Sequence, residues 1–204
     1  ADLRGALTPP VTKHHAAITD PAEVGELLRA IDGYTGQPTT LAAFKLSPLV
    51  FLRPGELRSA EWAHLDLDAA LWRIPAGKMK MGVEHLIPLS VQAVAILRDL
   101  HPLTGRGRFC FPGLRSVTRP MSDGTINAAL RRLDYGNDEH VAHGFRAMAR
   151  TMMAERLSGI PQDMVKVQMG NGKKGTVAMA NERAEAIAHP HPTMHSGATP
   201  LAKL

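Results

Sequence analysis

The sequence has few of the features that mark secreted, disulfide-linked or membrane proteins. It contains one cysteine, Cys110, among 204 residues, so it can form neither an internal disulfide nor a zinc site with a second cysteine. No run of 18 or more apolar residues occurs, and Asp2 and Arg4 stand near the start, so neither a membrane span nor a signal peptide is predicted. We therefore expect a soluble, cytoplasmic protein that does not contact a membrane, in a reducing compartment where Cys110 is a buried structural residue.

Features of a metal enzyme or a repeat protein are also missing. No internal repeat is apparent, and no cluster of carboxylates of the kind that binds Mg²⁺ is present. Three histidines, His189, His191 and His195, lie in a His/Pro-rich tail without the spacing of a preformed zinc site. We predict no metal site and no cofactor, and a disordered tail over residues 189–204.

The charge of the chain is positive. Lysine and arginine number 24 against 19 aspartates and glutamates, which gives a net charge of +5. Residues 104–156 contain nine arginines and no lysine. The planar guanidinium of arginine can donate two parallel hydrogen bonds to a phosphate. Net charge alone is a weak argument for a nucleic-acid partner, because charged helix surfaces are common.

Apolar residues recur mainly at helical spacing. Asp20, Pro21 and Glu23 predict a helix start with an N-cap, a proline at the first position and a capping-box glutamate. Residues 71–74 and 85–89 predict a β-hairpin. Further helices are expected at residues 39–52 with a bend at Pro48, at 57–62, after caps at Ser90 and Ser122, and at 143–157, 161–169 and 177–188. The pattern predicts a mostly α, α+β domain with helices around a small antiparallel sheet.

Three segments are expected from the same pattern. Residues 1–19 lack sustained periodicity and have the composition of a linker from an upstream DNA-binding domain that the chain does not contain. Residues 20–188 form the main domain, in which the helical pattern breaks from residue 171 onward. The tail described above follows.

Three separated motifs become informative together. They are LRPGEL at residues 52–57, KMKM at 78–81 followed by IPL at 87–89, and HGFR at 143–146. Each is weak alone, because R-P-G is a common turn and an isolated H-x-x-R is frequent. Their order and spacing, with similarity over about residues 20–169, resemble the catalytic domain of the phage-type tyrosine recombinase (integrase) family.

This resemblance implies the tyrosine recombinase catalytic-domain fold and a site for a DNA phosphodiester. Its positions are Arg53, Lys80, His143 and Arg146. Arg53 and Arg146 would hold the charge that builds on the nonbridging oxygens. Lys80 would protonate the leaving 5′-oxygen, although Lys78 could take its place.

His143 and Glu56 also have roles in the site that the resemblance implies. His143 shares a helix face with Arg146, at i and i+3, and would donate a hydrogen bond or manage the nucleophile's proton. Glu56 is expected to be structural, holding Arg53 or the turn.

The sequence departs from the family at two positions near its end. Where the family has a second histidine this chain has Asn171, and where it has the tyrosine nucleophile this chain has Asn181, in a register fixed by the shared R-A-E at residues 183–185. The only tyrosines are Tyr34 and Tyr135, both in predicted turns, and Thr176 lies five residues before the expected position. Asn171 and Asn181 are thus degenerate catalytic positions.

The function expected from these residues is site-specific DNA recombination or integration, on a domain that binds duplex DNA but no longer cleaves it. Self-association on DNA is compatible with it. Two alternatives remain: a non-catalytic DNA-binding prophage remnant, and a metal-free phosphodiesterase that uses Arg53, His143 and Arg146 with water.

Overall fold

Six helices and two small antiparallel sheets make up the part of the chain that the structure describes. The structure is a computed structural model, which describes residues 14–79 and 82–156, together with Val165 and Met169. The helices are α1 (Pro21–Asp32), α2 (Pro38–Val50), α3 (Pro54–Arg58), α4 (Val91–Thr104), α5 (Thr125–Arg132) and α6 (Gly144–Arg156). The predicted helices at 161–169 and 177–188 and the tail lie mostly or wholly outside the described residues.

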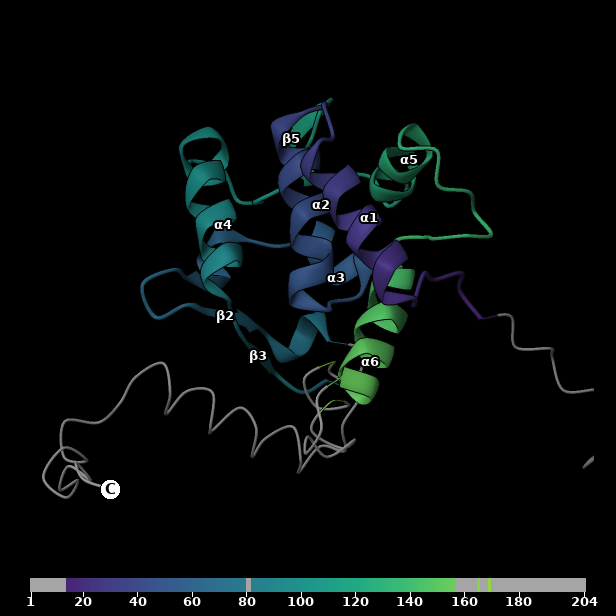
Figure 1. Cartoon of the computed structure of the whole chain (residues 1–204). Helices are drawn as coiled ribbons and strands as arrows, with labels where there is room; N and C mark the ends of the chain where they lie inside the picture. The colour runs from purple at the N-terminus through teal and green to yellow at the C-terminus, as the bar shows by residue number, and fades with distance from the viewer. Residues whose placement is uncertain (1–13, 80–81, 157–164, 166–168, 170–204) are drawn as a thin grey trace, which may run out of the picture.

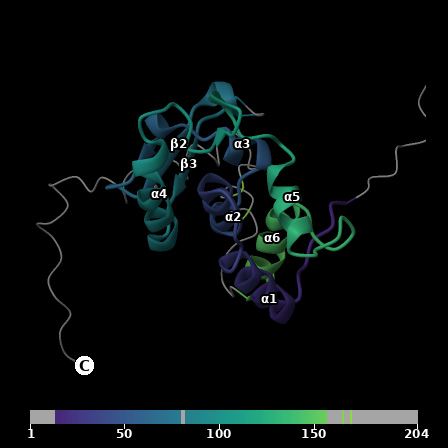
Figure 2. The ribbon, with the colours of Figure 1, turned by 90° about the horizontal axis from the view of Figure 1, so that it is seen from above.

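Helix α2 is the centre of the fold. It contacts α1, α3, α4, α5 and α6, and Figures 1 and 2 show it between α4 on one side and α1 and α6 on the other. Apart from Thr39, Thr40, Lys45 and Ser47 its residues are apolar, and both Thr40 and Ser47 are buried, which is the pattern of a buried helix. Ala43, Phe44 and Leu46 have no exposed surface. The helix continues past Pro48 and ends where Phe51 adopts a left-handed backbone with φ 55°.

Two of the predicted helix caps are confirmed and one is wrong. The side chain of Asp20 accepts hydrogen bonds from the backbone N–H of Ala22 (2.9 Å) and of Glu23 (3.2 Å) at the start of α1. Ser90 caps α4 in the same way. Ser122 does not cap α5, because its hydroxyl pairs with the hydroxyl of Thr125 at 2.9 Å and the N-cap residue is Gly124.

The helix expected at residues 57–62 is displaced. Helix α3 begins at Pro54 and ends at Arg58, and a single 3-10 turn, Trp62–His64, follows it. Proline at the first position needs no hydrogen-bond donor, and Glu56 bonds back to the backbone of Arg53, so the helix starts earlier than its apolar residues indicate.

The predicted hairpin is confirmed, and the structure adds strands to it. Strands β2 (Leu71–Ile74) and β3 (His85–Pro88) are antiparallel, and the 3-10 turn Ala76–Lys78 lies at the tip. Strand β1 (Leu65–Asp66), which pairs with β2, was not predicted, nor was a second sheet of β4 (Pro112–Gly113) and β5 (Ser116–Pro120). These strands are short or rich in proline and glycine, so they lack the alternating pattern of a strand.

The core surrounds α2 and takes buried side chains from the other helices and from the first sheet. Its largest fully buried side chains include Trp72, Phe44, Phe111 and Phe145. Cys110 is buried beside Phe111, as predicted. No helix within the described residues is long and apolar enough to cross a membrane.

Candidate functional site

Arg53 is held at the start of α3 by Glu56. The backbone N–H of Arg53 donates to Glu56 Oε2 at 2.9 Å, and its guanidinium Nη1 lies 2.6 Å from Oε1. Both bonds follow from the short turn that Pro54 begins. The structural role expected for Glu56 agrees with this geometry, and the half-buried guanidinium of Arg53 is fixed at the surface.

Arg146 lies in the first turns of α6 and is buried, with 7% of its surface exposed. Its Nη1 donates to the carbonyl of Phe51, and its Nη2 donates to the carbonyl of Met169 at 2.8 Å. The left-handed backbone of Phe51 is two residues before Arg53, so the two arginines are brought close. Burial, and then the charge of Arg53, lower the pKa of Arg146 from its ordinary value, which still leaves the guanidinium charged at neutral pH.

His143 stands between two cavities that adjoin at its ring. The first, of about 470 Å³, is also lined by Arg53, Lys78 and His64. The second, of about 550 Å³, is also lined by Arg146 and Arg150. The structure therefore brings three of the four predicted residues, Arg53, His143 and Arg146, to one region of the surface. Lys80, Asn171 and Asn181 lie outside the described residues.

A buried carboxylate that the sequence analysis did not identify holds Lys78 at the first cavity. Glu61 is 8% exposed, and its Oε1 lies 2.5 Å from Lys78 Nζ and 2.8 Å from Arg108 Nη2. Burial alone would raise the pKa of Glu61, but the hydrogen bonds from Arg108 and Lys78 outweigh it and the pKa is lowered. No sequence signal pointed to this cluster, because Arg108 lies 47 positions from Glu61 in the chain.

The charges around His143 favour its neutral form. Its pKa is lowered first by partial burial and then by the charges of His15, Arg146 and Arg53, while Glu56 acts in the opposite direction. A neutral imidazole offers one donor and one acceptor at pH 7. His143 can therefore either donate a hydrogen bond to an anion or accept a proton.

The two tyrosines of the chain lie away from this region. Tyr34 is 5% exposed, and its hydroxyl accepts from Arg132 Nη1 at 3.2 Å. Tyr135 lies in the connection between α5 and α6, and burial followed by the charges of Glu26 and Glu139 raises its pKa. Neither belongs to the described residues that line the two cavities.

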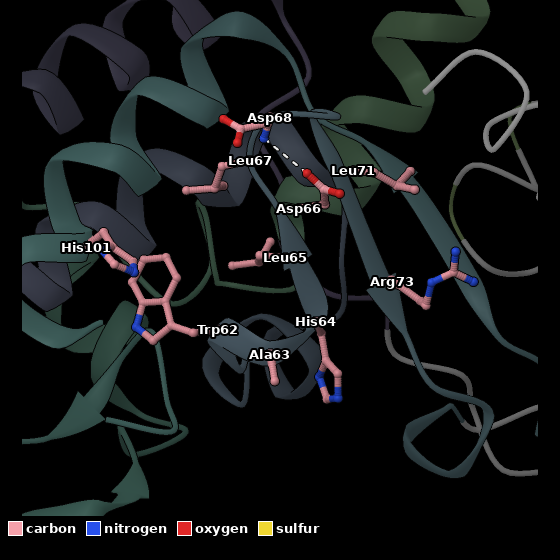
Figure 3. A pocket seen from close by; sticks show the side chains of 10 residues that line it. All are labelled: Trp62, Ala63, His64, Leu65, Asp66, Leu67, Asp68, Leu71, Arg73 and His101. Carbon is pink, nitrogen blue, oxygen red and sulfur yellow. Dashed lines mark hydrogen bonds between the residues drawn. The ribbon is translucent and has the colours of Figure 1, made fainter. Parts of the chain in front are cut away.

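A further cavity lies on the other side of His64 and is shown in Figure 3. Trp62 and His101 stand on one side of it, and Asp66 and Asp68 line it from β1 and the turn that follows, where the backbone N–H of Asp68 donates to Asp66 Oδ1 at 3.1 Å. Two exposed carboxylates make it unfavourable for a phosphate. Nor does any group of three or more His, Cys, Asp or Glu within the described residues have the arrangement of a metal site.

Comparison with known proteins decides the family. A model of the phage integrase family matches residues 18–186 of this chain. The chain belongs to this family. The integrase of Enterobacteria phage P4 is 37% identical over 88% of this chain and 44% of its own length. The chain therefore spans less than half of that relative.

Solved structures of phage integrases share the fold. The integrase from mycobacterium phage Brujita has a TM-score of 0.63 at 20% identity, over 89% of this chain and 59% of its own. The λ integrase tetramer bound to a Holliday junction has a TM-score of 0.58 at 16% identity, over 83% of this chain and 51% of its own. These likenesses confirm the predicted fold class.

Proposed function

We propose that this member of the phage integrase family is a site-specific recombination domain that binds the phosphates of duplex DNA at Arg53, His143 and Arg146. The observation that carries the proposal is the meeting of these three residues, from separate parts of the chain, around two adjoining cavities. Two fixed arginine forks and a neutral histidine are suited to a phosphodiester, whose charge they neutralise in a defined geometry. No cofactor is required for this role.

The lysine of the site has two candidates. Lys80 has the position that the family resemblance assigns to the proton donor. Lys78 lines the cavity with Arg53 and His143, and Glu61 fixes its ammonium group. Because Glu61 holds the ammonium group of Lys78 in place, we assign phosphate binding to Lys78 and the family's proton-donor position to Lys80.

The partner that we propose is duplex DNA, in the cytoplasm, with self-association of the protein on the DNA. The λ integrase relatives were solved as a tetramer on a Holliday junction and as a dimer on a core site, which supports this arrangement. Because Asn181 stands where the family has its tyrosine, we propose that binding is kept and cleavage is lost. A DNA-binding prophage remnant would have the same properties.

Fluorescence anisotropy with a labelled duplex tests the proposal. Affinity should fall by orders of magnitude between about 50 and 200 mM salt if roughly six or more phosphates are contacted. Arg53→Ala should weaken binding about tenfold at low salt, because a charge-assisted contact worth roughly 1.5 kcal/mol is lost. Arg98→Ala on α4 removes the same charge outside both cavities and should change the affinity little.

Two results would contradict the proposal. One is an absence of binding at 50 mM salt. The other is an equal effect of Arg53→Ala and Arg98→Ala. Since removing Arg53 also exposes the carboxylate of Glu56, the double variant Arg53→Ala/Glu56→Gln separates the lost contact from new repulsion.

A further inference from the structure

The segment that precedes α1 is packed against the start of α6. The backbone N–H of Val141 donates to the carbonyl of Ala16 at 3.3 Å, and the N–H of Ile18 donates to His140 Nδ1 at 3.1 Å. Figure 1 shows this purple segment leaving α1 beside the green α6. Two hydrogen bonds therefore join residues that are more than 120 positions apart in the sequence.

The packing is close enough to require glycine in α6. A Cβ atom at Gly144 would meet the carbonyl oxygen of Ala16 well inside van der Waals contact and the Cα of Ala17 at 3.2 Å. Gly144 is in a helical conformation, so glycine is not needed there to allow a left-handed backbone. Glycine is needed because it has no Cβ atom, which lets the backbone of Ala16 and Ala17 approach the backbone of α6.

The docked segment places His15 on His143. The two rings are stacked, with centroids 4.4 Å apart and an interplanar angle of 19°. His15 also lines the cavity that contains Arg146 and Arg150. One face of the His143 ring is thus covered by a residue from outside the segments that carry the family motifs.

We propose that His15 is a positioning residue of the phosphate site, which holds the His143 ring by stacking on it, and that His140 fixes the segment that carries His15. The purpose of this arrangement rests on the proposed function, in which His143 contacts a DNA phosphate. The presence of the stack does not depend on the proposed function, because the stack can be measured without DNA.

The chemistry of His140 suits it to this task. Its side chain has no exposed surface, and burial, followed by the charge of Arg131, lowers its pKa to about 4. It is neutral at pH 7, and since Nδ1 accepts the hydrogen bond from Ile18, the proton is on Nε2. Protonation of Nδ1 would remove the acceptor and release the segment.

Loss of the stack should change how His143 titrates. The titratable and charged groups around His143 are His14 and His15 from the docked segment, Arg146, Arg150 and Glu155 from α6, Arg53 and Glu56 from the start of α3, and His64 and Lys78 across the first cavity. Of these, His15 both covers the ring and adds positive charge when protonated. Removing it therefore takes away two causes of the lowered pKa, and the pKa of His143 should rise.

Nuclear magnetic resonance titration of the histidine ring protons in the whole chain tests this expectation, with His143→Gln used to assign the resonance. In His15→Ala the pKa of His143 should rise, and the upfield ring-current shift of its Hε1 should disappear. In His15→Phe the ring current should remain and the rise should be smaller, because burial is kept and only charge is lost. His14→Ala removes the neighbouring histidine, which lines the same cavity but neither stacks on His143 nor contributes to its lowered pKa, and it should change neither quantity.

Gly144→Ala supplies a second test that leaves both histidines in place. The added methyl group should push the segment away while favouring the helix, so His143 should titrate as in His15→Ala. The proposal is overturned if His143 titrates identically in the wild type and in His15→Ala, if His14→Ala has an equal effect, or if Gly144→Ala leaves the ring-current shift intact. Failure to bind DNA would refute the proposed function and leave these results unchanged.

Discussion

Arg146 belongs both to the packing of the domain and to the proposed phosphate site. Its two carbonyl partners, Phe51 and Met169, join α6 to the end of α2 and to a segment beyond α6. These bonds use two of the five N–H donors of the guanidinium, so donors remain for an anion. A lysine could not replace it, because a single ammonium group cannot reproduce the planar fork.

Substitution of Arg146 should therefore lower stability as well as DNA binding. Arg146→Ala leaves the carbonyls of Phe51 and Met169 without their donors, and the free energy of unfolding should fall by about 2–3 kcal/mol. Arg150→Ala, one turn later and exposed, should change it by less than about 0.5 kcal/mol. Urea unfolding followed by circular dichroism measures both. Equal stability of the two variants would show that the carbonyl bonds contribute nothing to the fold.

At the scale of elements, His140 joins the segment before α1 to the start of α6 and makes that contact dependent on pH. In the folded chain its pKa is about 4, against an ordinary value of 6.5. Between these values the unfolded state binds a proton that the folded state does not, so the free energy of unfolding falls as the pH falls through this window. The full shift corresponds to roughly 3 kcal/mol, and the stability is fully present above pH 6.5.

Replacing His140 by a residue that cannot titrate should flatten this dependence. His140→Gln keeps an oxygen that can accept from Ile18, so it should lose less stability on going from pH 7 to pH 4.5 than the wild type. His14→Gln, at an exposed position, should follow the wild-type profile. Urea unfolding at the two pH values measures the difference, and parallel profiles for the wild type and His140→Gln would contradict the assignment.

The elements that could be predicted are those whose signals are local. Helix α1 has its cap, its proline and its apolar spacing within a few residues, and the β2–β3 hairpin has two strand-like runs around a polar tip. Strands β4 and β5 could not be predicted, because Pro112 and Gly113 are typical of loops. Tertiary pairing, not local preference, makes them strands.

The candidate site follows the same division. Arg53, His143 and Arg146 could be proposed as site residues from the sequence because each belongs to a short motif of a known family. The stack of His15 on His143 and the pairing of Glu61 with Lys78 and Arg108 could not, since each depends on segments that only folding brings together. Family motifs thus identified the groups proposed to contact phosphate, and the structure added the groups that hold them.

At the scale of the whole molecule, the proposed phosphate site would lack the family's nucleophile. Asn181, which the family resemblance places at the tyrosine position, offers no hydroxyl. Tyr34 is buried with its hydroxyl on Arg132, and Tyr135 lies in the connection before α6. A phosphotyrosine bond needs a hydroxyl in line with the leaving oxygen at roughly 3 Å, and phosphate-binding arginines cannot replace it. We therefore expect this chain to bind DNA and to form no covalent link to it.

Denaturing electrophoresis of the protein with a labelled suicide duplex tests this expectation, because only a covalent complex survives denaturation. No shifted band should form with the wild type, nor with Tyr34→Phe or Tyr135→Phe. Asn181→Tyr should restore little activity, since Asn171 also replaces the second histidine of the family. If the wild type does give a band and either phenylalanine variant abolishes it, that tyrosine is the nucleophile. The chain would then cleave DNA by a geometry that differs from the one its family motifs imply.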